Sequence, residues 1–221
     1  MAHLRSVHVG TPRDEAWAGR LQRTAIDKVS VTGPVRVTAR GVAGDEVADT
    51  VHHGHPHQAV YAVAREDLDR WQEELGGPVP DGLFGENLTT SGIDVNDALV
   101  GERWRIGGVL LEVASVRIPC SVFASWLGRN GLPERGWVRR FTQDARPGPY
   151  LRVLQEGELQ AGDAVEVVHR PDHDVTVSTL FRALTGEPAL LPRLLAVEGL
   201  VAAHRERAEA HVAGSSYAVE R

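Results

Sequence analysis

The chain has 221 residues, a formal net charge of -6 and 42% hydrophobic residues. This length suits one large domain, or one domain with a small appendage, and the acidic balance argues against a nucleic-acid-binding protein, which usually needs a broad basic face. The single cysteine excludes an intramolecular disulfide. Because no signal-peptide pattern and no membrane-spanning apolar run is recognisable, we expect a cytoplasmic protein without membrane association.

The basic residues are unusual in kind. Of the 24 lysines and arginines together, only Lys28 is a lysine. A GC-rich genome is a sufficient explanation. Whatever the origin, this protein would grip phosphates or carboxylates with planar guanidinium groups, which bind such anions in a bidentate manner.

Residues 3 to about 168 contain many short apolar runs separated by glycine-rich turns, which predicts a barrel or a folded-over sheet. Two helices interrupt this pattern. One spans Arg65 to Leu75 and stops at the glycines that follow, and a shorter one spans Ser121 to Leu127, with Ser121 as its cap. The predicted strands are residues 29–31, 35–39, 59–63, 104–106, 109–116, 150–154 and 164–168.

After Pro171 the apolar spacing becomes helical and predicts three short helices. They carry no obvious catalytic cluster, so we expect them to pack on the barrel or to mediate contacts. The predicted organisation is therefore a barrel domain over residues 1–170, a three-helix segment over 171–212 and a tail over 213–221.

The cysteine ends a strand-like run, in the order Arg117-Ile118-Pro119-Cys120. Proline cannot donate to a sheet ladder, so the strand should stop there and present Cys120 on the following turn. An arginine three residues earlier would favour the thiolate, the form that attacks electrophiles and binds soft metals. The alternative is a buried cysteine that acts as a small hydrophobe.

Four of the ten histidines fall between His52 and His57. His53, His55 and His57 alternate, so a strand would place them on one face, where they could ligate a metal. Gly54 and Pro56 make a regular strand improbable, and solvated loop histidines are the commoner case. The sequence leaves both interpretations open.

The segment from Gly82 to Thr90 places two glycines around Phe84 and then Glu86 and Asn87. Backbone amides in such a turn can approach a ligand closely, and two polar side chains could be aimed at it. A glycine turn before a strand has the same pattern, so the motif is weak in isolation.

Arginines gather around a glycine-proline loop further along the chain. Arg139 and Arg140 precede it, and Arg146 enters it. Together they could clamp an anion, although a solvated charged loop is an equally good interpretation.

These motifs, taken together, resemble the MOSC family, named after the C-terminal domain of molybdenum cofactor sulfurase. The chain is most similar to the stand-alone bacterial YiiM-like branch, in which a three-helix segment follows the barrel. The segments that carry the resemblance are, in order, Gly44-Asp45, His53-Gly54, Gln58-Ala59-Val60-Tyr61, Phe84-Gly85-Glu86-Asn87-Leu88, Arg117-x-Pro119-Cys120, Tyr150-x-Arg152-Val153-Leu154 and Gly157 to Asp163.

The resemblance implies a fold that is mainly β with α, a MOSC-type β-barrel followed by a small three-helix C-terminal unit. It further implies an open face that binds molybdenum cofactor, a pterin with a dithiolene and a phosphate. In related amidoxime-reducing enzymes the family cysteine ligates molybdenum, and the matching position here is Cys120. Arg117 would support the thiolate or the anionic cofactor.

Other site residues follow from the same resemblance. Glu86, Asn87 and the amide of Gly85 would line the pterin, and Arg140 and Arg146 would be candidates for its phosphate. The full set implied for cofactor binding is His53, Gly54, Phe84, Gly85, Glu86, Asn87, Arg140 and Arg146.

The implied activity is the reduction of small N-hydroxylated or N-oxygenated substrates. Because the chain contains no flavin or haem motif, electrons would come from a separate protein. The oligomeric state stays open, with a homodimer among the options.

One segment departs from the family pattern. The family commonly reads His-Gly-Gly-x-Asp-Lys-Ala-Val in this segment. Between His53 and Val60 this chain has His55 in place of the second glycine, His57 in place of the aspartate and Gln58 in place of the lysine. The loss of that lysine removes a cation from the expected cofactor loop. Two other functions therefore stay open: a sulfur or cofactor carrier with a persulfide on Cys120, or a diverged protein that binds another metal through His53, His55 and His57.

Overall fold

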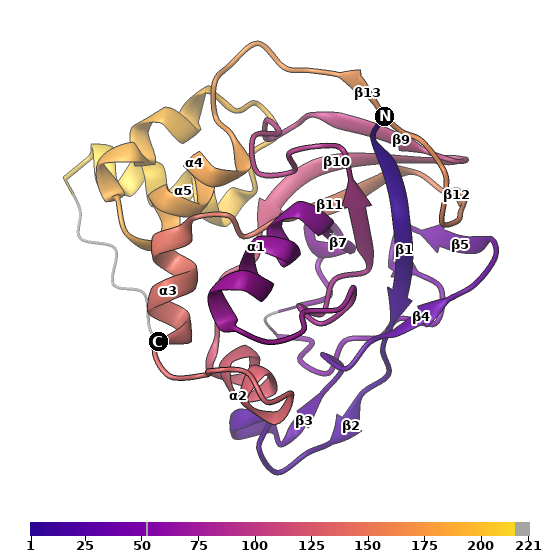
Figure 1. Cartoon of the computed structure of the whole chain (residues 1–221). Coiled ribbons are helices and arrows are strands. Elements are labelled where there is room, and N and C mark those ends of the chain that lie inside the picture. The colour runs from indigo at the N-terminus through magenta and orange to yellow at the C-terminus, as the bar shows by residue number, and fades with distance from the viewer. Residues whose placement is uncertain (52, 215–221) are drawn as a thin grey trace.

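The computed structural model describes residues 1–51 and 53–214 (Figure 1). Its main element is an eight-stranded mixed sheet with the order β13-β9-β10-β11-β7-β8-β1-β4, in which only β7 and β8 run parallel. The strands of this sheet are β1 (His3–Val9), β4 (Val29–Val31), β7 (Val60–Ala64), β8 (Leu88–Ser91), β9 (Arg103–Ile106), β10 (Val109–Val116), β11 (Pro149–Gln155) and β13 (Val165–His169).

The sheet curls without closing. Among the described residues its two end strands, β13 and β4, do not pair with each other. The chain just before β13 nevertheless reaches β1, where His3 and Ala164 form an isolated bridge and the amide of Leu4 donates to the carbonyl of Asp163 at 2.8 Å. The result is a barrel-like sheet that stays open at one seam.

Two small sheets extend the structure on the side of β1. One has the order β12-β5-β6, formed by β12 (Gly157–Leu159), β5 (Val35–Thr38) and β6 (Gly41–Val42). The other is the hairpin of β2 (Arg13–Asp14) and β3 (Arg23–Thr24), which encloses the short 3₁₀ helix η1 (Gly19–Leu21).

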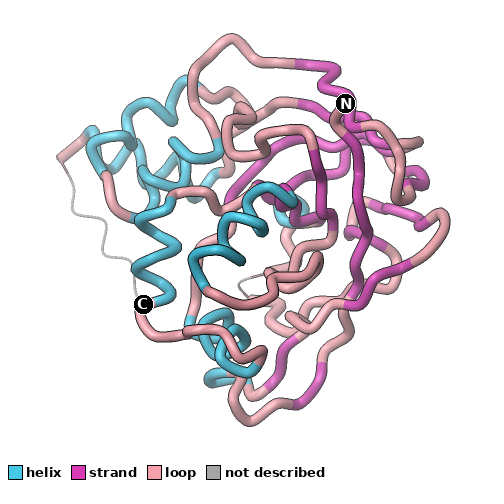
Figure 2. The backbone as a smooth tube through the Cα atoms, in the orientation of Figure 1, coloured by secondary structure: helices cyan, strands magenta, loops and turns pink. Residues whose placement is uncertain are grey.

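Helices gather at one side and at the centre of the view, and most strands lie opposite them (Figure 2). Helices and strands contribute about equally to the structure, so the chain is less strand-rich than the sequence indicated. The remaining helices are α1 (Arg65–Leu75), α2 (Ser121–Arg129), α3 (Trp137–Asp144), α4 (Val177–Thr185) and α5 (Ala202–Val212), with the 3₁₀ helices η2 (Pro56–Gln58) and η3 (Pro188–Ala196). None of the helices in the described ranges is long and apolar enough to span a lipid bilayer.

An aromatic cluster joins α1, α2 and α3. The ring of Trp71 lies 4.7 Å from that of Trp137 and 6.2 Å from that of Phe141, and Phe84 lies 5.0 Å from Phe123. All five side chains are buried. Large aromatic side chains that pack at these distances contribute most of the apolar burial in a core, so this cluster fixes the positions of α2 and α3.

The C-terminal helices pack on one side of the sheet. The amide of Val177, the first residue of α4, donates to the carbonyl of Ala98 at 2.9 Å, and Ser115 on β10 hydrogen-bonds to His204 on α5 at 3.0 Å. The middle predicted helix is the 3₁₀ segment η3, which contains Pro192. Of the predicted tail, residues 215–221 lie outside the described residues.

The local predictions differ in how well they match the structure. The prediction for α1 and that for β10 agree with the observed bounds, and α2 begins at Ser121 as expected. The expected cap is wrong: Cys120 is the N-cap residue of α2, and no side chain caps that end. No helix was predicted for the arginine-rich stretch after Gly136, where an anion clamp and a solvated charged loop were both left open. It forms α3, because Trp137 and Phe141, four residues apart, both bury their rings.

Candidate functional site

Cys120 lies at the corner between the end of β10 and the start of α2. The strand ends at Val116, Pro119 is buried, and Cys120 has an extended backbone immediately before the first helical turn. The thiol is free and exposed. The structure therefore places the single cysteine on a surface, where it can react or bind a ligand, and not in the core.

The side chain of Arg117 lies next to this cysteine in a mostly aromatic environment. Its guanidinium carbon is 4.6 Å from the ring centroid of Phe123 and 5.2 Å from that of Tyr61. No carboxylate lies within ion-pair distance of it in the part of the chain that the structure describes. This half-buried cation thus has aromatic neighbours but no counter-ion.

Arg117 nevertheless keeps its proton and its positive charge. Burial by itself would lower its pKa, but the oxygens of Tyr150 and Tyr61 and the sulfur of Cys120 raise the pKa above its usual value. A permanently charged guanidinium beside an exposed thiol favours an anion at this corner.

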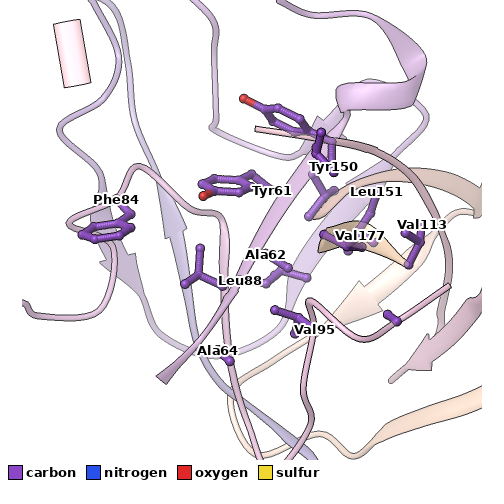
Figure 3. Close-up of a cluster of buried hydrophobic side chains, with 14 of the residues drawn as sticks. Tyr61, Ala62, Ala64, Phe84, Leu88, Val95, Val113, Tyr150, Leu151 and Val177 are labelled. Atoms are coloured by element: carbon purple, nitrogen blue, oxygen red, sulfur yellow. The ribbon is translucent and has the colours of Figure 1, made fainter. Parts of the chain in front are cut away.

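Tyr61 and Tyr150 form the wall behind Arg117. They come from the neighbouring strands β7 and β11, where they are directly paired, and their ring centroids are 5.1 Å apart. Figure 3 shows the two rings next to each other with both hydroxyl groups directed to the same side. Burial raises the pKa of both phenols, so both keep their protons at neutral pH.

The glycine turn before β8 lies next to the side chain of Arg117. Gly85 has a φ of +73°, and a Cβ atom at this position would lie 3.6 Å from Nη1 of Arg117 and 3.1 Å from a side-chain carbon of Ile26. A larger residue would therefore be strained in its backbone and would crowd Ile26, while its Cβ atom would be in ordinary contact with the guanidinium. The amide of Gly85 donates to the carbonyl of Gly82 at 2.9 Å, so it serves the turn itself.

The two polar residues of that turn point into the protein. Glu86 is fully buried, and its Oε1 accepts hydrogen bonds from the amide of Gly82 at 2.5 Å and the hydroxyl of Thr89 at 3.0 Å. Its other oxygen, Oε2, has no hydrogen-bond partner among the described residues. Burial raises the pKa of this carboxyl, which favours its neutral form.

Asn87 is likewise committed to the fold. Its Oδ1 accepts from the amide of Tyr61 at 3.0 Å, and its Nδ2 donates to the carbonyl of His8 at 3.2 Å and to Asp45 at 2.8 Å. Phe84 belongs to the aromatic cluster described above. In this structure, therefore, Phe84, Glu86 and Asn87 shape the turn that carries Gly85, and the one polar side-chain atom of the three without a partner, Oε2 of Glu86, is buried.

Lys28 is a charged residue of this region that the sequence did not single out as a site residue. Its side chain is 8% exposed, and the ammonium forms an ion pair with Asp45, which also accepts from the amide of Gly10 at 2.7 Å. Burial lowers the pKa of Lys28, and the nearby charge of Arg117 lowers it further, although Asp45 counteracts both effects. The signal was its uniqueness as the only lysine, which we interpreted as a matter of composition.

The histidine segment does not form a metal centre in the described part of the chain. His52 lies outside the described residues. His55 and His57 flank the start of η2 and stack face to face, with centroids 5.3 Å apart and an interplanar angle of 3°. Searched over the described residues, no group of three histidine, cysteine, aspartate or glutamate side chains could hold a metal ion, so His53, His55 and His57 are not brought together as ligands. Gly54, beside His53, lies in the same loop, at φ +81°.

The two arginines expected to hold a phosphate have other partners. Arg146 forms ion pairs with Asp67 at 2.6 Å and Asp94 at 2.8 Å. Arg140, on α3, donates to the carbonyl of Pro133 at 2.5 Å. None of these partners is Cys120 or Arg117. The hydrogen bonds and ion pairs of the two arginines therefore do not connect them to the corner that carries Cys120.

Comparison with known proteins assigns the family. Residues 49–166 match the MOSC domain. YflK from Bacillus subtilis is 30% identical over 172 residues, which are 78% of this chain and 76% of YflK. The chain therefore belongs to the MOSC family.

Two further proteins extend this result. The crystal structure of YiiM from Geobacillus stearothermophilus superposes with a TM-score of 0.77 and 25% identity, and the match covers 95% of this chain and 98% of that one. A Gibberella moniliformis protein named as a reductase is 33% identical over 173 residues, which are 76% of this chain but 29% of that protein. The chain is thus a YiiM-like MOSC protein, with a relative named as a reductase.

Proposed function

We propose that this protein binds molybdenum cofactor through Cys120 and reduces small N-hydroxylated compounds with electrons from a separate protein. The observation that carries the proposal is the exposed thiol of Cys120 beside Arg117, a cation without a carboxylate partner among the described residues. A buried charge without a counter-ion costs free energy, and this cost falls when an anionic ligand binds next to it.

The residues at this corner fit the cofactor. A thiolate is a suitable ligand for a soft metal, and one cysteine suffices because the dithiolene supplies further sulfur. Arg117 offers a planar set of donors to the negative charge of the cofactor. When bound, the cofactor would supply two-electron chemistry.

The reductase part of the proposal rests on similarity and on what the chain lacks. A relative that covers most of this chain is named as a reductase. The chain carries no recognisable flavin or haem motif, so the electrons would come from a partner protein. Within the site, Cys120 would hold the metal and Arg117 would orient the anionic ligand beside it.

The first experiment is elemental and pterin analysis of the protein produced with adequate cofactor supply. The wild type is compared with Cys120→Ala and with Ser121→Ala, which changes the neighbouring exposed residue and leaves the thiol in place. We expect near-stoichiometric molybdenum and pterin in the wild type and in Ser121→Ala, and neither in Cys120→Ala.

Other results would exclude the proposal. A wild type without molybdenum, but with a persulfide on Cys120, would identify a sulfur carrier. A first-row metal that is kept in Cys120→Ala and lost when His53, His55 and His57 are replaced together would place the binding site at the histidines.

A further inference from the structure

We propose that the hairpin of residues 13–24 is a steric barrier beside Cys120, which admits small ligands to the thiol and excludes bulky ones. This hairpin consists of β2, η1 and β3, and it lies next to α2 (Figure 1). The inference concerns access to the thiol itself, and only its extension to substrates rests on the proposed function.

The hairpin is a long excursion between two strands that are already paired. Val9, at the end of β1, lies directly opposite Val29, at the start of β4, so a tight turn could have joined these strands. The chain instead continues through residues 10–28 and folds back on itself, with Arg13 paired to Thr24. Ordering the additional residues costs conformational entropy, so contacts with the rest of the protein have to hold the hairpin in place.

An aromatic stack holds the hairpin against α2. The ring of Trp17 stacks on that of Trp126, with centroids 5.9 Å apart and an interplanar angle of 20°. The guanidinium carbon of Arg129 lies 5.2 Å from the ring centroid of Trp17, which adds a cation–π contact. The indole nitrogen of Trp126 donates to the carbonyl of Leu83 at 2.9 Å, so the stack is also tied to the glycine turn before β8.

The tip of the hairpin lies at the first turn of α2. A Cβ atom on Gly19 would be 3.3 Å from Cγ2 of Val122, two residues after Cys120. Val122, Trp126 and Arg129 are spaced four and three residues apart, so they share one face of the helix, and the hairpin lies along this face. The helical rise places Val122 only about 3 Å beyond Cys120 along the helix axis.

The base of the hairpin lies on the other side of the cysteine. Ile26, two residues after β3, is buried. A Cβ atom on Gly85 would lie 3.1 Å from Cγ1 of Ile26 and 3.6 Å from Nη1 of Arg117, so Gly85 separates these two side chains. The contacts of the hairpin at Arg117 and at Val122 therefore flank Cys120 in the sequence, and the hairpin borders the corner along its length.

A border of this kind selects ligands by size. Cys120 is exposed, so a small molecule can reach the thiol. A bulky molecule would have to displace the hairpin and break the stack of Trp17 on Trp126. Because side-chain contacts hold the hairpin, it can be released or shortened without any change to Cys120 or Arg117.

The reactivity of the thiol tests the barrier without any cofactor. Cys120 is the only cysteine, so alkylation of the full-length chain, produced without molybdenum cofactor, reports on this corner alone. We would compare N-methylmaleimide with N-pyrenylmaleimide, which share a reactive group and differ in bulk. The size ratio is the rate constant of the pyrenyl reagent divided by that of the methyl reagent, and glutathione gives its value for an unhindered thiol.

Three variants isolate the hairpin. Trp17→Ala removes the stack, and Trp17→Phe is the matched control that keeps an aromatic ring on Trp126. In the third variant, Asn-Gly replaces residues 15–22, which joins the paired residues Asp14 and Arg23 by a tight turn and deletes the tip. Circular dichroism and thermal unfolding show that each variant is folded before its thiol is measured.

In the wild type we expect a size ratio at least about tenfold below that of glutathione. Trp17→Ala and the shortened hairpin should bring it to within about threefold of the glutathione value, and Trp17→Phe should keep the wild-type value. The rate constant for N-methylmaleimide should be the same in all four proteins, because a small reagent does not meet the barrier.

Two results would overturn the inference: a wild-type size ratio equal to that of glutathione, or a low ratio that the shortened hairpin leaves unchanged. In the molybdenum-loaded protein, the shortened hairpin should raise kcat/KM for a biphenyl amidoxime relative to benzamidoxime by about tenfold. An unchanged preference there would refute the extension to substrates. A protein that shows the size effect on the thiol but reduces neither amidoxime would refute the reductase function and leave the barrier in place.

Discussion

Two arginines in this protein occupy opposite kinds of environment. Arg146, between α3 and β11, forms ion pairs with two carboxylates, and one of these, Asp67, is buried and also accepts from Asn96 at 2.7 Å. Arg117 lies against aromatic rings, and no carboxylate pairs with it in the described residues. The charge of Arg146 is neutralised by carboxylates within the fold, whereas the charge of Arg117 is left for a ligand to neutralise.

This difference separates a cation that the fold neutralises from one that we propose to act on the cofactor. Asp67 and Arg146 tie α1 to the loop before β11, and the amide of Gly148 in that loop donates to Asn96 at 2.9 Å. The network therefore holds the loop from which Tyr150 follows. It supports the Cys120 corner from a distance and contributes no free charge to it.

The largest expected effect comes from Arg117. Replacement by methionine keeps much of the side-chain volume and removes the charge, so an anionic cofactor loses its counter-ion. We expect molybdenum content to fall by at least about tenfold, while the free energy of unfolding of the cofactor-free protein stays unchanged or rises, because an uncompensated, half-buried charge has been removed. Elemental analysis and urea unfolding would measure the two quantities. Full molybdenum content in this variant would contradict the comparison.

Arg146→Met should show the reverse behaviour. Asp67 would lose its closest cation while it stays buried, which typically destabilises a protein by about 3 kcal/mol. Urea unfolding would measure this loss. The molybdenum content of the protein that remains folded should match the wild type, and a specific loss of molybdenum would show that Arg146 acts on the cofactor after all.

His204 tests whether the fold tolerates an added positive charge away from the corner that carries Cys120. His204 on α5 hydrogen-bonds to Ser115 and faces His57 and Arg207. Burial, with a contribution from those two groups, lowers its pKa to about 4. Because the folded pKa lies below the ordinary value of about 6.5, the neutral form is the stabilising one.

The stability that His204 contributes is therefore complete above pH 6.5 and is lost as the pH falls towards 4. We expect the wild type to lose about 2 kcal/mol from this group between pH 7 and pH 5. Chemical unfolding at both pH values would measure it, with His204→Gln as the variant and His211→Gln, an exposed histidine of the same helix, as the control. The same pH dependence in His204→Gln as in the wild type would contradict this assignment.

The smallest expected effect concerns Tyr61. Tyr61→Phe removes the donor to the carbonyl of Pro147, and a single lost hydrogen bond costs about 1 kcal/mol. We expect thermal unfolding to shift accordingly, with Tyr150→Phe affected less, because no acceptor in the described structure depends on its hydroxyl. A larger stability loss in Tyr150→Phe than in Tyr61→Phe would contradict this expectation.

Local patterns predicted the elements whose stability is local. The apolar spacing and the glycines after Leu75 gave α1, and the branched residues from Val109 to Val116 gave β10. The helix α3 escaped prediction because its arginines dominate the local sequence, whereas Trp137 and Phe141 are stabilised by rings from α1 and α2. Such contacts join residues far apart in the chain and leave no local pattern.

The candidate site divides in the same way. Cys120 and Arg117 were predicted as a pair because they lie three residues apart in the sequence, at the end of a strand that a proline terminates. Tyr61, Tyr150 and Lys28 reach that corner only through the pairing of separate strands and loops, so no spacing rule could have found them. Conversely, Asn87 and Arg146 were expected to bind a ligand, but hydrogen bonds and ion pairs within the protein occupy their polar atoms.

The bridge between β1 and the chain before β13 also bears on synthesis of the protein. β4 covers the C-terminal half of one edge of β1, but the N-terminal half of that edge pairs with residues 163 and 164 and therefore waits for about 160 further residues. At typical rates of translation this takes about 10 to 30 s. During that time this end of the strand keeps unpaired backbone groups, so we expect truncation before residue 162 to leave an open edge that promotes aggregation.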